Sequence, residues 1–212
     1  MTLLDEISAA VQEGNKNSAE ALTQQAIDQN ISAQTILSDA LVPAMDIIGE
    51  KFSNNEIFVP EMLVAARAMN AATVLLKPLL VAEGAEVIGK AVIGTIKGDL
   101  HDIGKNLVRM MIESKGIEVT DLGVDVSNEQ FVDYLKEHED VTLVAYSALL
   151  TTTLGELKEA IQAICDAGLR DRVKILVGGA PVTQAYADEI GADGYAPDAG
   201  SAAEKAAELL SA

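Results

Sequence analysis

The fold is decided by the stretch Ala91-Val92-Ile93-Gly94-Thr95-Ile96-Lys97-Gly98-Asp99-Leu100-His101-Asp102-Ile103-Gly104. Its first six residues form a short, continuous apolar run that is rich in β-branched side chains, and such a run predicts a buried strand. Apolar residues then recur at helical spacing from Ile103 through Leu107 to Met111, which predicts an amphipathic helix. His101 therefore lies on a loop at the carboxyl end of a strand, where ligands bind in open α/β sheets.

Downstream of this loop, strands and helices continue to alternate to the end of the chain. The predicted strands are 91–96, 117–120, 142–146, 173–177 and 193–195. The predicted helices begin near residues 103, 129, 154 and 182, and a helix rich in Ala, Glu and Leu ends the chain. Five β/α units in succession predict a doubly wound parallel sheet of flavodoxin-like or Rossmann-like type. The right-handed crossover rule leaves few other topologies.

Upstream of the sheet, residues 1–82 contain no convincing strand. Apolar residues recur there at helical spacing in four segments, which predicts an antiparallel four-helix bundle. The last helix is expected to begin near Val59, with Pro60 in its first turn, and to be kinked or shortened at Pro78. We place the linker at 83–86, so the expected domains are a helical domain, 1–86, and a sheet domain, 87–212.

The composition excludes several classes of partner. The 212 residues include 33 acidic and 15 basic side chains, a net charge of −18, which argues against nucleic acid and anionic membranes. We find no run near the roughly 20 apolar residues of a membrane span and no signal-peptide pattern. A cytoplasmic protein is therefore expected. The single cysteine, Cys165, cannot form an internal disulfide and is expected in the helical core.

The motifs at three strand ends form an ordered set. Asp99-x-His101-x-x-Gly104 is followed after 42 residues by Ser147-x-Leu149, and after 28 more by Gly178-Gly179. This set resembles the cobalamin-binding signature of corrinoid proteins and of the cobalamin module of methionine synthase. The segment 52–69 resembles the helical cap domain of the same family, so the resemblance spans nearly the whole chain.

The resemblance implies that His101 binds the cobalt of a corrinoid from below and displaces the cofactor's own base. A neutral imidazole suits this role, and its second nitrogen needs a partner, for which Asp99 is well placed. Thr153 supplies the hydroxyl that completes an axial-ligand relay of Asp99, His101 and Thr153, where many relatives have serine. Taken without the flanking motif, His101 would be interpreted as an ordinary loop histidine that is hydrogen-bonded to the backbone.

The remaining site residues each have a structural alternative. Asp102 precedes a helix and is expected to be its N-cap, with contact to the corrin edge secondary. Thr153 begins a capping-box pattern, and Phe52 and Val59 have the hydrophobicity of bundle core. The family instead places Phe52 and Val59 over the upper corrin face. The expected cofactor-binding residues are Gly98, Asp99, Leu100, His101, Asp102, Ile103, Gly104, Ser147, Leu149, Thr151, Thr153, Gly178, Gly179, Tyr195, Phe52 and Val59. The resemblance implies that Ser147, Leu149 and Thr151 surround the nucleotide tail, that Gly178-Gly179 leaves room for it, and that the segment at Tyr195 closes its pocket.

The resemblance implies a methyl carrier that cycles between Co(I) and methyl-Co(III), with methylcobalamin, hydroxocobalamin or a related corrinoid as cofactor. Its partners would be a substrate-specific methyltransferase, a second methyltransferase and a reductive activator, because the chain has no substrate site of its own. The partner enzyme chooses the methyl donor, whether a methylamine, methanol or a methoxyaromatic compound. The alternatives are an adenosylcobalamin-dependent sensor and a detached domain of a radical mutase.

Overall fold

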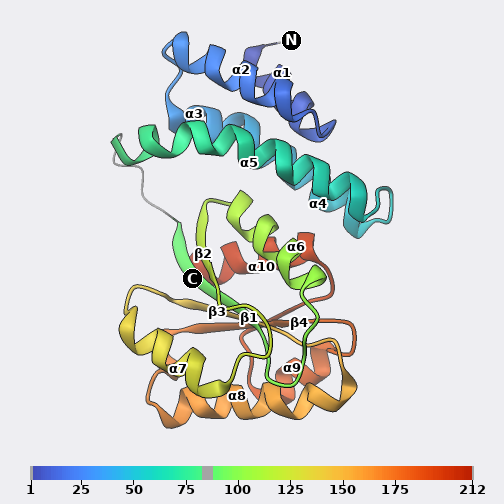
Figure 1. Cartoon of the computed structure of the whole chain (residues 1–212), viewed down its shortest axis with the longest axis vertical. Helices are drawn as coiled ribbons and strands as arrows, with labels where there is room; N and C mark the ends of the chain where they lie inside the picture. Colours follow the sequence, from blue (N-terminus) through green and yellow to red (C-terminus); the bar gives the residue numbers. More distant parts are fainter. Residues whose placement is uncertain (1, 83–87, 212) are drawn as a thin grey trace. The chain divides into compact units, whose positions relative to one another are not determined.

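The computed structural model describes residues 2–82 and 88–211 of the chain (Figure 1). These residues belong to two compact units, Met1–Glu86 and Val87–Ala212. The first is helical and the second is built on a parallel sheet, as the sequence predicts. The linker predicted at 83–86 lies outside the described residues.

The first unit consists of successive helices with short connections. They are α1 (Leu3–Gln12), α2 (Lys16–Asp28), α3 (Ala33–Ile36), the π-helical segment η1 (Leu37–Leu41), α4 (Val42–Ser53) and α5 (Val59–Ala82). The third predicted helix is thus a continuous run of α3, η1 and α4. Pro43 has no N–H to donate to the carbonyl four residues before it, and the wider π turn ends just before this proline.

Helix α5, with 24 residues, extends further than the sequence predicts. It begins at Val59 as expected but continues through Pro78 to Ala82. By length and composition alone, its segment Val59–Leu80 is apolar enough to cross a membrane, a test that core helices of soluble proteins also pass. Met62, Met69 and Leu76 of α5 are buried in the helical unit, as in a core helix.

The second unit is a five-stranded sheet with helices on both faces. Its elements are β1 (Gly89–Thr95), α6 (Ile103–Ser114), β2 (Ile117–Asp121), α7 (Asn128–Glu137), β3 (Leu143–Ser147), η2 (Thr151–Thr153), α8 (Leu154–Asp166), η3 (Arg170–Arg172), β4 (Lys174–Gly178), α9 (Gln184–Ile190), β5 (Gly194–Ala196) and α10 (Ala199–Ser211). All strand pairs are parallel in the order β2-β1-β3-β4-β5, which confirms the flavodoxin-like prediction. Helices α6 and α10 cover one face, and α7, α8 and α9 cover the other (Figure 1).

The strand register brings four strand ends into one row. Thr95 is aligned with Ser147, Ser147 with Gly178, and Gly178 with Ala196. Directly behind this row, Phe131 of α7 packs edge-on against Tyr146 with ring centroids 4.6 Å apart. The carboxyl edge of the sheet is therefore lined by small residues and backed by a dense aromatic and aliphatic core.

Cys165 is exposed, so the prediction of a buried thiol is wrong. The buried face of α8 is formed by Leu157, Ala160, Ile161 and Ile164. Cys165 follows Ile164 by one residue, a rotation of about 100° around the helix, which turns its side chain away from that face.

Gly179, directly after β4, lies against the backbone of Ala148, directly after β3. A Cβ on Gly179 would lie 1.8 Å from the carbonyl oxygen of Ala148, and Gly179 has a φ of +124°. We expect Gly179→Ala to lower the free energy of unfolding by about 3 kcal/mol or more, because backbone must move. Urea unfolding monitored by circular dichroism measures the change.

The matched control is Gly168→Ala, where φ is +70° but nothing lies within 4 Å of the added Cβ. Backbone strain alone should cost about 1 kcal/mol there. Equal losses in the two variants would show that φ, and not the contact with Ala148, requires glycine at position 179.

Candidate functional site

The candidate site is built around the carboxylate of Asp99, which is fully buried in the loop between β1 and α6. One oxygen accepts hydrogen bonds from the backbone N–H and the ring Nδ1 of His101, at 3.0 and 2.6 Å. The other accepts from the backbone N–H groups of Leu149 and Leu150, at 2.6 and 3.2 Å. A single side chain thus joins the loops that follow β1 and β3.

These hydrogen bonds determine the charge of Asp99. Burial on its own raises the pKa of a carboxyl group, because it disfavours the charged form. At Asp99 the N–H groups of Leu149, His101 and Leu150 and the ring of His101 outweigh burial, and the pKa of Asp99 is lowered. The site therefore contains a buried carboxylate that stays ionised at neutral pH.

His101 is held at one ring nitrogen and is open at the other. Its Nδ1 faces Asp99, so a neutral ring carries its proton there and leaves the Nε2 lone pair available. The His101 side chain is 51% exposed, although its partner is completely buried. A carboxylate-oriented imidazole with a free Nε2 is the arrangement that proteins use for metal ligation.

Two predicted roles of hydroxyl and carboxyl groups near this pair are wrong. Thr153 is buried, but its hydroxyl donates to the carbonyl of Leu150 at 2.9 Å and not to Asp99, so the predicted triad is not formed. Thr153 also makes no capping hydrogen bond to α8. The reason is that backbone N–H groups already occupy the Asp99 oxygen on that side.

Asp102 also differs from its predicted role. It stands at the N-cap position of α6, but its side chain makes no capping hydrogen bond. Instead it accepts from the side chain of Asn106, at 3.2 Å, and the cap geometry is not extended, with φ −124° and ψ −18°. The first backbone N–H groups of α6 are therefore not capped by this carboxylate.

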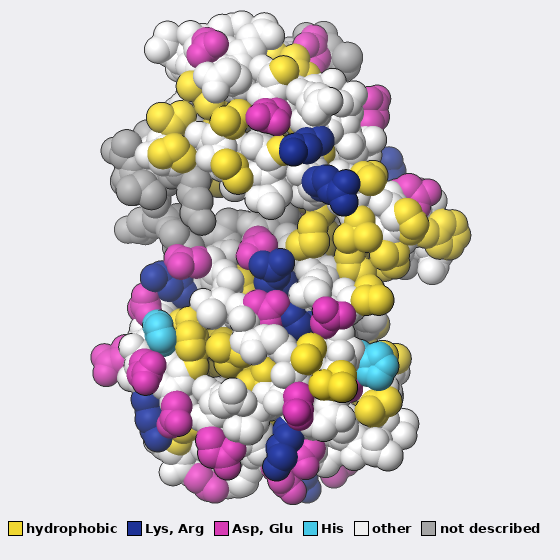
Figure 2. Space-filling view, in the orientation of Figure 1, with side chains coloured by type: hydrophobic (Ala, Val, Ile, Leu, Met, Phe, Trp, Pro, Cys, Tyr) yellow, Lys and Arg dark blue, Asp and Glu magenta, His cyan; other side chains and the backbone are white. Residues whose placement is uncertain are grey.

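Large apolar side chains near His101, in the loops joined by Asp99, are exposed to solvent. Leu100 and Ile103 are 71% and 72% exposed, and Leu149 and Leu150 are 41% and 37% exposed. Ile103 begins the apolar face predicted for α6, yet it lies outside the core. Figure 2 shows hydrophobic patches among the acidic side chains on the visible face of this unit. An apolar surface of this kind indicates a site for a large apolar ligand.

Of the glycines at this edge, Gly104 leaves open space, whereas Gly178 and Gly179 lie close to the backbone of Ala196 and Ala148. Gly98 has a φ of +81°, and a Cβ on Gly104, in the first turn of α6, would meet nothing within 4 Å. Gly178 ends β4, with Gly179 directly after it, whereas Ser147 ends β3 and Thr151 is exposed in η2. The structure thus gathers the predicted residues of the loops after β1, β3 and β4 at one edge of the sheet.

Tyr195, Phe52 and Val59 are placed differently from that group. Tyr195 is aligned with Val177, one row behind the sheet edge, and packs against the core on the α7–α9 face. Its predicted contact with a nucleotide tail is not favoured by this position. Phe52 and Val59 are half-buried in the helical unit and keep their expected role over the corrin as a prediction.

Sequence reasoning missed several groups that hold the loop. Thr95 is buried and its hydroxyl donates to the carbonyl of His101 at 2.8 Å. Asp125, in the loop after β2, accepts from the backbone N–H of Gly98 at 2.7 Å. The position of Thr95, a threonine at the end of a buried strand, could have indicated that its hydroxyl bonds the following loop. The sequence around Asp125 gave no comparable indication of its contact with Gly98.

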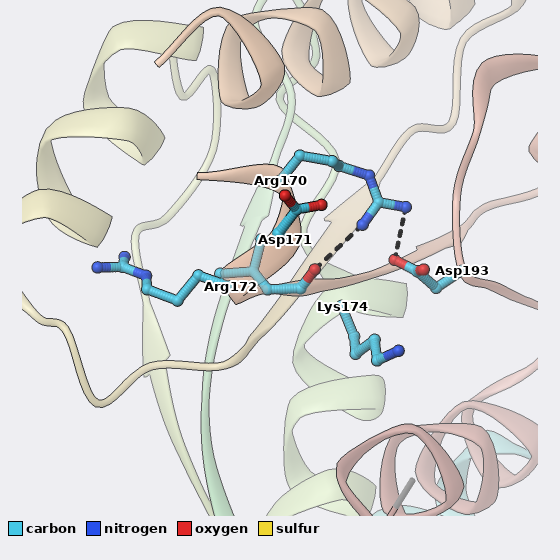
Figure 3. A pocket seen from close by; sticks show the side chains of 6 residues that line it. Arg170, Asp171, Arg172, Lys174 and Asp193 are labelled. Atoms are coloured by element: carbon cyan, nitrogen blue, oxygen red, sulfur yellow. Dashed lines mark hydrogen bonds and ion pairs between the residues drawn. The ribbon is translucent and has the colours of Figure 1, made fainter. Parts of the chain in front are cut away.

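A pocket of about 460 Å³ lies at the opposite, amino-terminal edge of the sheet (Figure 3). It is lined by Arg170, Asp171, Arg172, Val173, Lys174 and Asp193. Arg170 pairs with Asp193 at 2.9 Å and donates to the carbonyls of Val173 and Gly191. Arg172 points away from this pair in Figure 3. These charges join the starts of β4 and β5, so the pocket is a structural feature.

The side-chain donors at the carboxyl edge of the sheet suit a metal that is already coordinated by a macrocycle. Among residues 2–82 and 88–211, no group of three or more His, Cys, Asp or Glu side chains is placed to hold a metal ion. His101 offers one imidazole nitrogen, and its neighbours offer apolar surface. The residues therefore fit a corrinoid, whose macrocycle supplies the other ligands and an apolar face.

Comparisons with known proteins agree with this chemistry. Residues 3–77 and residues 89–204 each match a B12 binding domain. The chain is 41% identical to the dimethylamine corrinoid protein of Methanosarcina barkeri over 98% of this chain and 97% of that protein. Among solved structures, a cobalamin-binding protein from Desulfitobacterium hafniense superposes with a TM-score of 0.83 at 31% identity, covering 97% of this chain and 98% of that one. The methanol:cobalamin methyltransferase complex of Methanosarcina barkeri gives a TM-score of 0.82 at 27% identity, covering 99% and 80%.

The charge of Asp99 predicts a pH-dependent stability. Asp99→Asn should lower the free energy of unfolding by about 2 kcal/mol near neutral pH, because an amide N–H₂ would face backbone N–H donors. Since the folded-state pKa of Asp99 is lowered, the wild-type advantage is present above about pH 4 and is lost as the pH falls through that pKa. Urea unfolding of both proteins over a pH series measures this difference.

Thr153→Val serves as the control because the Thr153 hydroxyl does not contact Asp99. It should leave the pH dependence of the wild type unchanged. A Thr153→Val profile that matches Asp99→Asn would restore the predicted three-member relay.

Proposed function

The chain belongs to the corrinoid proteins and takes a corrinoid of the cobalamin type as its cofactor, and from this premise we propose that it is a methyl carrier. It would accept a methyl group from a substrate-specific methyltransferase and pass it to a second methyltransferase. When bound, the corrinoid supplies the transfer chemistry by alternating between Co(I) and methyl-Co(III). The observation that carries the proposal is the Asp99–His101 pair beside exposed apolar side chains.

His101 would ligate the corrinoid's cobalt through Nε2. Its Nδ1 proton is held by Asp99 at 2.6 Å, so the ring orientation is fixed before a cofactor binds. The exposed side chains of Leu100, Ile103 and Leu149 would be covered by the macrocycle, and the open space at Gly104 would allow its close approach.

Asp99 would hold the Nδ1 proton of His101 both when Nε2 binds the corrinoid's cobalt and when it does not. The Nδ1 atom and the carboxylate oxygen lie 2.6 Å apart, so this proton is held in a short hydrogen bond. The Leu149 and Leu150 N–H groups keep Asp99 ionised throughout, so the proton would reside on the imidazole. In this chain the relay therefore needs only Asp99 and His101.

Methyltransferase partners are supported by the comparison with the methanol:cobalamin methyltransferase complex. The higher identity to a dimethylamine corrinoid protein favours a methylated amine as the donor class to test first. Phe52 and Val59 of the helical unit remain our candidates for covering the upper corrin face. A reductive activator is proposed as a third partner, since Co(I) is readily oxidised.

The visible spectrum of the protein loaded with hydroxocobalamin tests the proposal. We expect a spectrum in which the cofactor's own base is displaced by a histidine, and we expect His101→Ala to lose it. Reduction followed by a methyl donor should convert the wild type to the methylated form. The ligand role requires the Nε2 lone pair, which alanine lacks.

His138→Ala is the matched control, because His138 is the other histidine of the chain and is exposed on the C-cap of α7. It should behave as the wild type. A histidine-bound spectrum that survives in His101→Ala would refute the assigned ligand. Binding of adenosylcobalamin without methylation would favour a sensor.

A further inference from the structure

The loop that carries Asp99 and His101 is tied to the loop after β2 by a reciprocal pair of hydrogen bonds. The backbone N–H of Gly98 donates to the carboxylate of Asp125 at 2.7 Å. The backbone N–H of Asp125 donates back to the carbonyl of Asp99 at 2.9 Å. Both bonds bracket the peptide that connects Gly98 to Asp99, so they fix the point from which the Asp99 side chain starts.

This contact is made by unusual backbone on both sides. Asp125 has a φ of +52°, and Gly98 has a φ of +81°. Of the described residues other than glycine, Asn30 and Asn55 are the only others with positive φ, and asparagine tolerates that region best. Backbone in this region costs about 1 kcal/mol for a residue with a Cβ. Such strain persists where surrounding contacts require it and often marks a functional site.

The Asp99 backbone must be positioned accurately because the Asp99 carboxylate forms hydrogen bonds with two loops at once. One oxygen must reach His101 and the other must reach the N–H groups of Leu149 and Leu150. The other backbone bond of Asp99, from its N–H to the carbonyl of Ile96, is 3.2 Å long. Without the Asp125 contacts, the loop after β1 would be free to shift toward the loop after β3. The Asp99 carboxylate would then move away from the His101 ring.

We propose that Asp125 is a positioning residue for the Asp99–His101 pair. It acts through the Gly98–Asp99 peptide, with which it forms both hydrogen bonds. The assignment rests on the proposed function only in taking His101 as the cobalt ligand. Residues that orient a ligand in this indirect way typically change metal affinity by about 10- to 100-fold when they are lost.

Two variants separate the hydrogen bond from the backbone conformation. Asp125→Gly keeps a residue that adopts positive φ freely but removes the acceptor for the Gly98 N–H. Asp125→Asn keeps both the acceptor oxygen and tolerance of positive φ. A third variant, Asp125→Ala, removes the same acceptor while retaining a Cβ, and it should act in the same direction as glycine.

The first readout uses the protein without corrinoid. Amide hydrogen exchange should be at least about tenfold faster at Gly98 and His101 in Asp125→Gly than in the wild type, and near wild type in Asp125→Asn. Amides of the buried strand β3 serve as the internal reference for global unfolding. Their exchange must stay unchanged for the effect to be assigned to the loop.

The second readout is the affinity for hydroxocobalamin and the fraction of histidine-bound spectrum. We expect Asp125→Gly to lower the affinity about tenfold and to reduce that fraction, with Asp125→Asn close to the wild type. Wild-type exchange and spectrum in Asp125→Gly would overturn the proposal, as would equal losses in the asparagine and glycine variants. Failure of the proposed function would show separately, in His101→Ala, and would leave the exchange result intact.

Discussion

The candidate site depends on one constraint, which is that a carboxylate without solvent contact must find donors for both of its oxygens. Asp99 meets this requirement with backbone N–H groups from two loops and with the ring of His101. An unpaired charge at such a depth would cost several kcal/mol. The loops after β1 and β3 are consequently held together by the need to solvate one ion.

The parallel sheet makes this arrangement attainable. Neighbouring strands β1 and β3 end in the same row, so the loops that leave them start side by side. The histidine then lies two residues beyond the carboxylate and is raised toward solvent. The described residues supply one oriented nitrogen and an apolar surface, and among them no group of three or more His, Cys, Asp or Glu side chains is placed to hold a metal ion.

Much of this could be predicted from the sequence, because the signals were local. The β-branched runs and helical spacings indicated all five strands, and the Asp-x-His pattern indicated the edge where a ligand binds. Hydrogen-bond partners were less predictable, since the hydroxyl of Thr153 can bond either a nearby carbonyl or a carboxylate. Hydrophobicity alone also predicted a buried thiol at Cys165, although Cys165 is exposed. The positive φ of Asp125 depends on contacts between loops that are distant in sequence.

The apolar surface near His101 has a consequence for the life of the protein in the cell. When no corrinoid is bound, Leu100 and Ile103 expose apolar surface to water, and exposed apolar surface is what chaperones and proteases recognise. A cofactor that binds the folded state alone adds about 4 kcal/mol of stability at a thousandfold excess over its dissociation constant. Corrinoid binding would therefore raise the fraction of this protein that is folded.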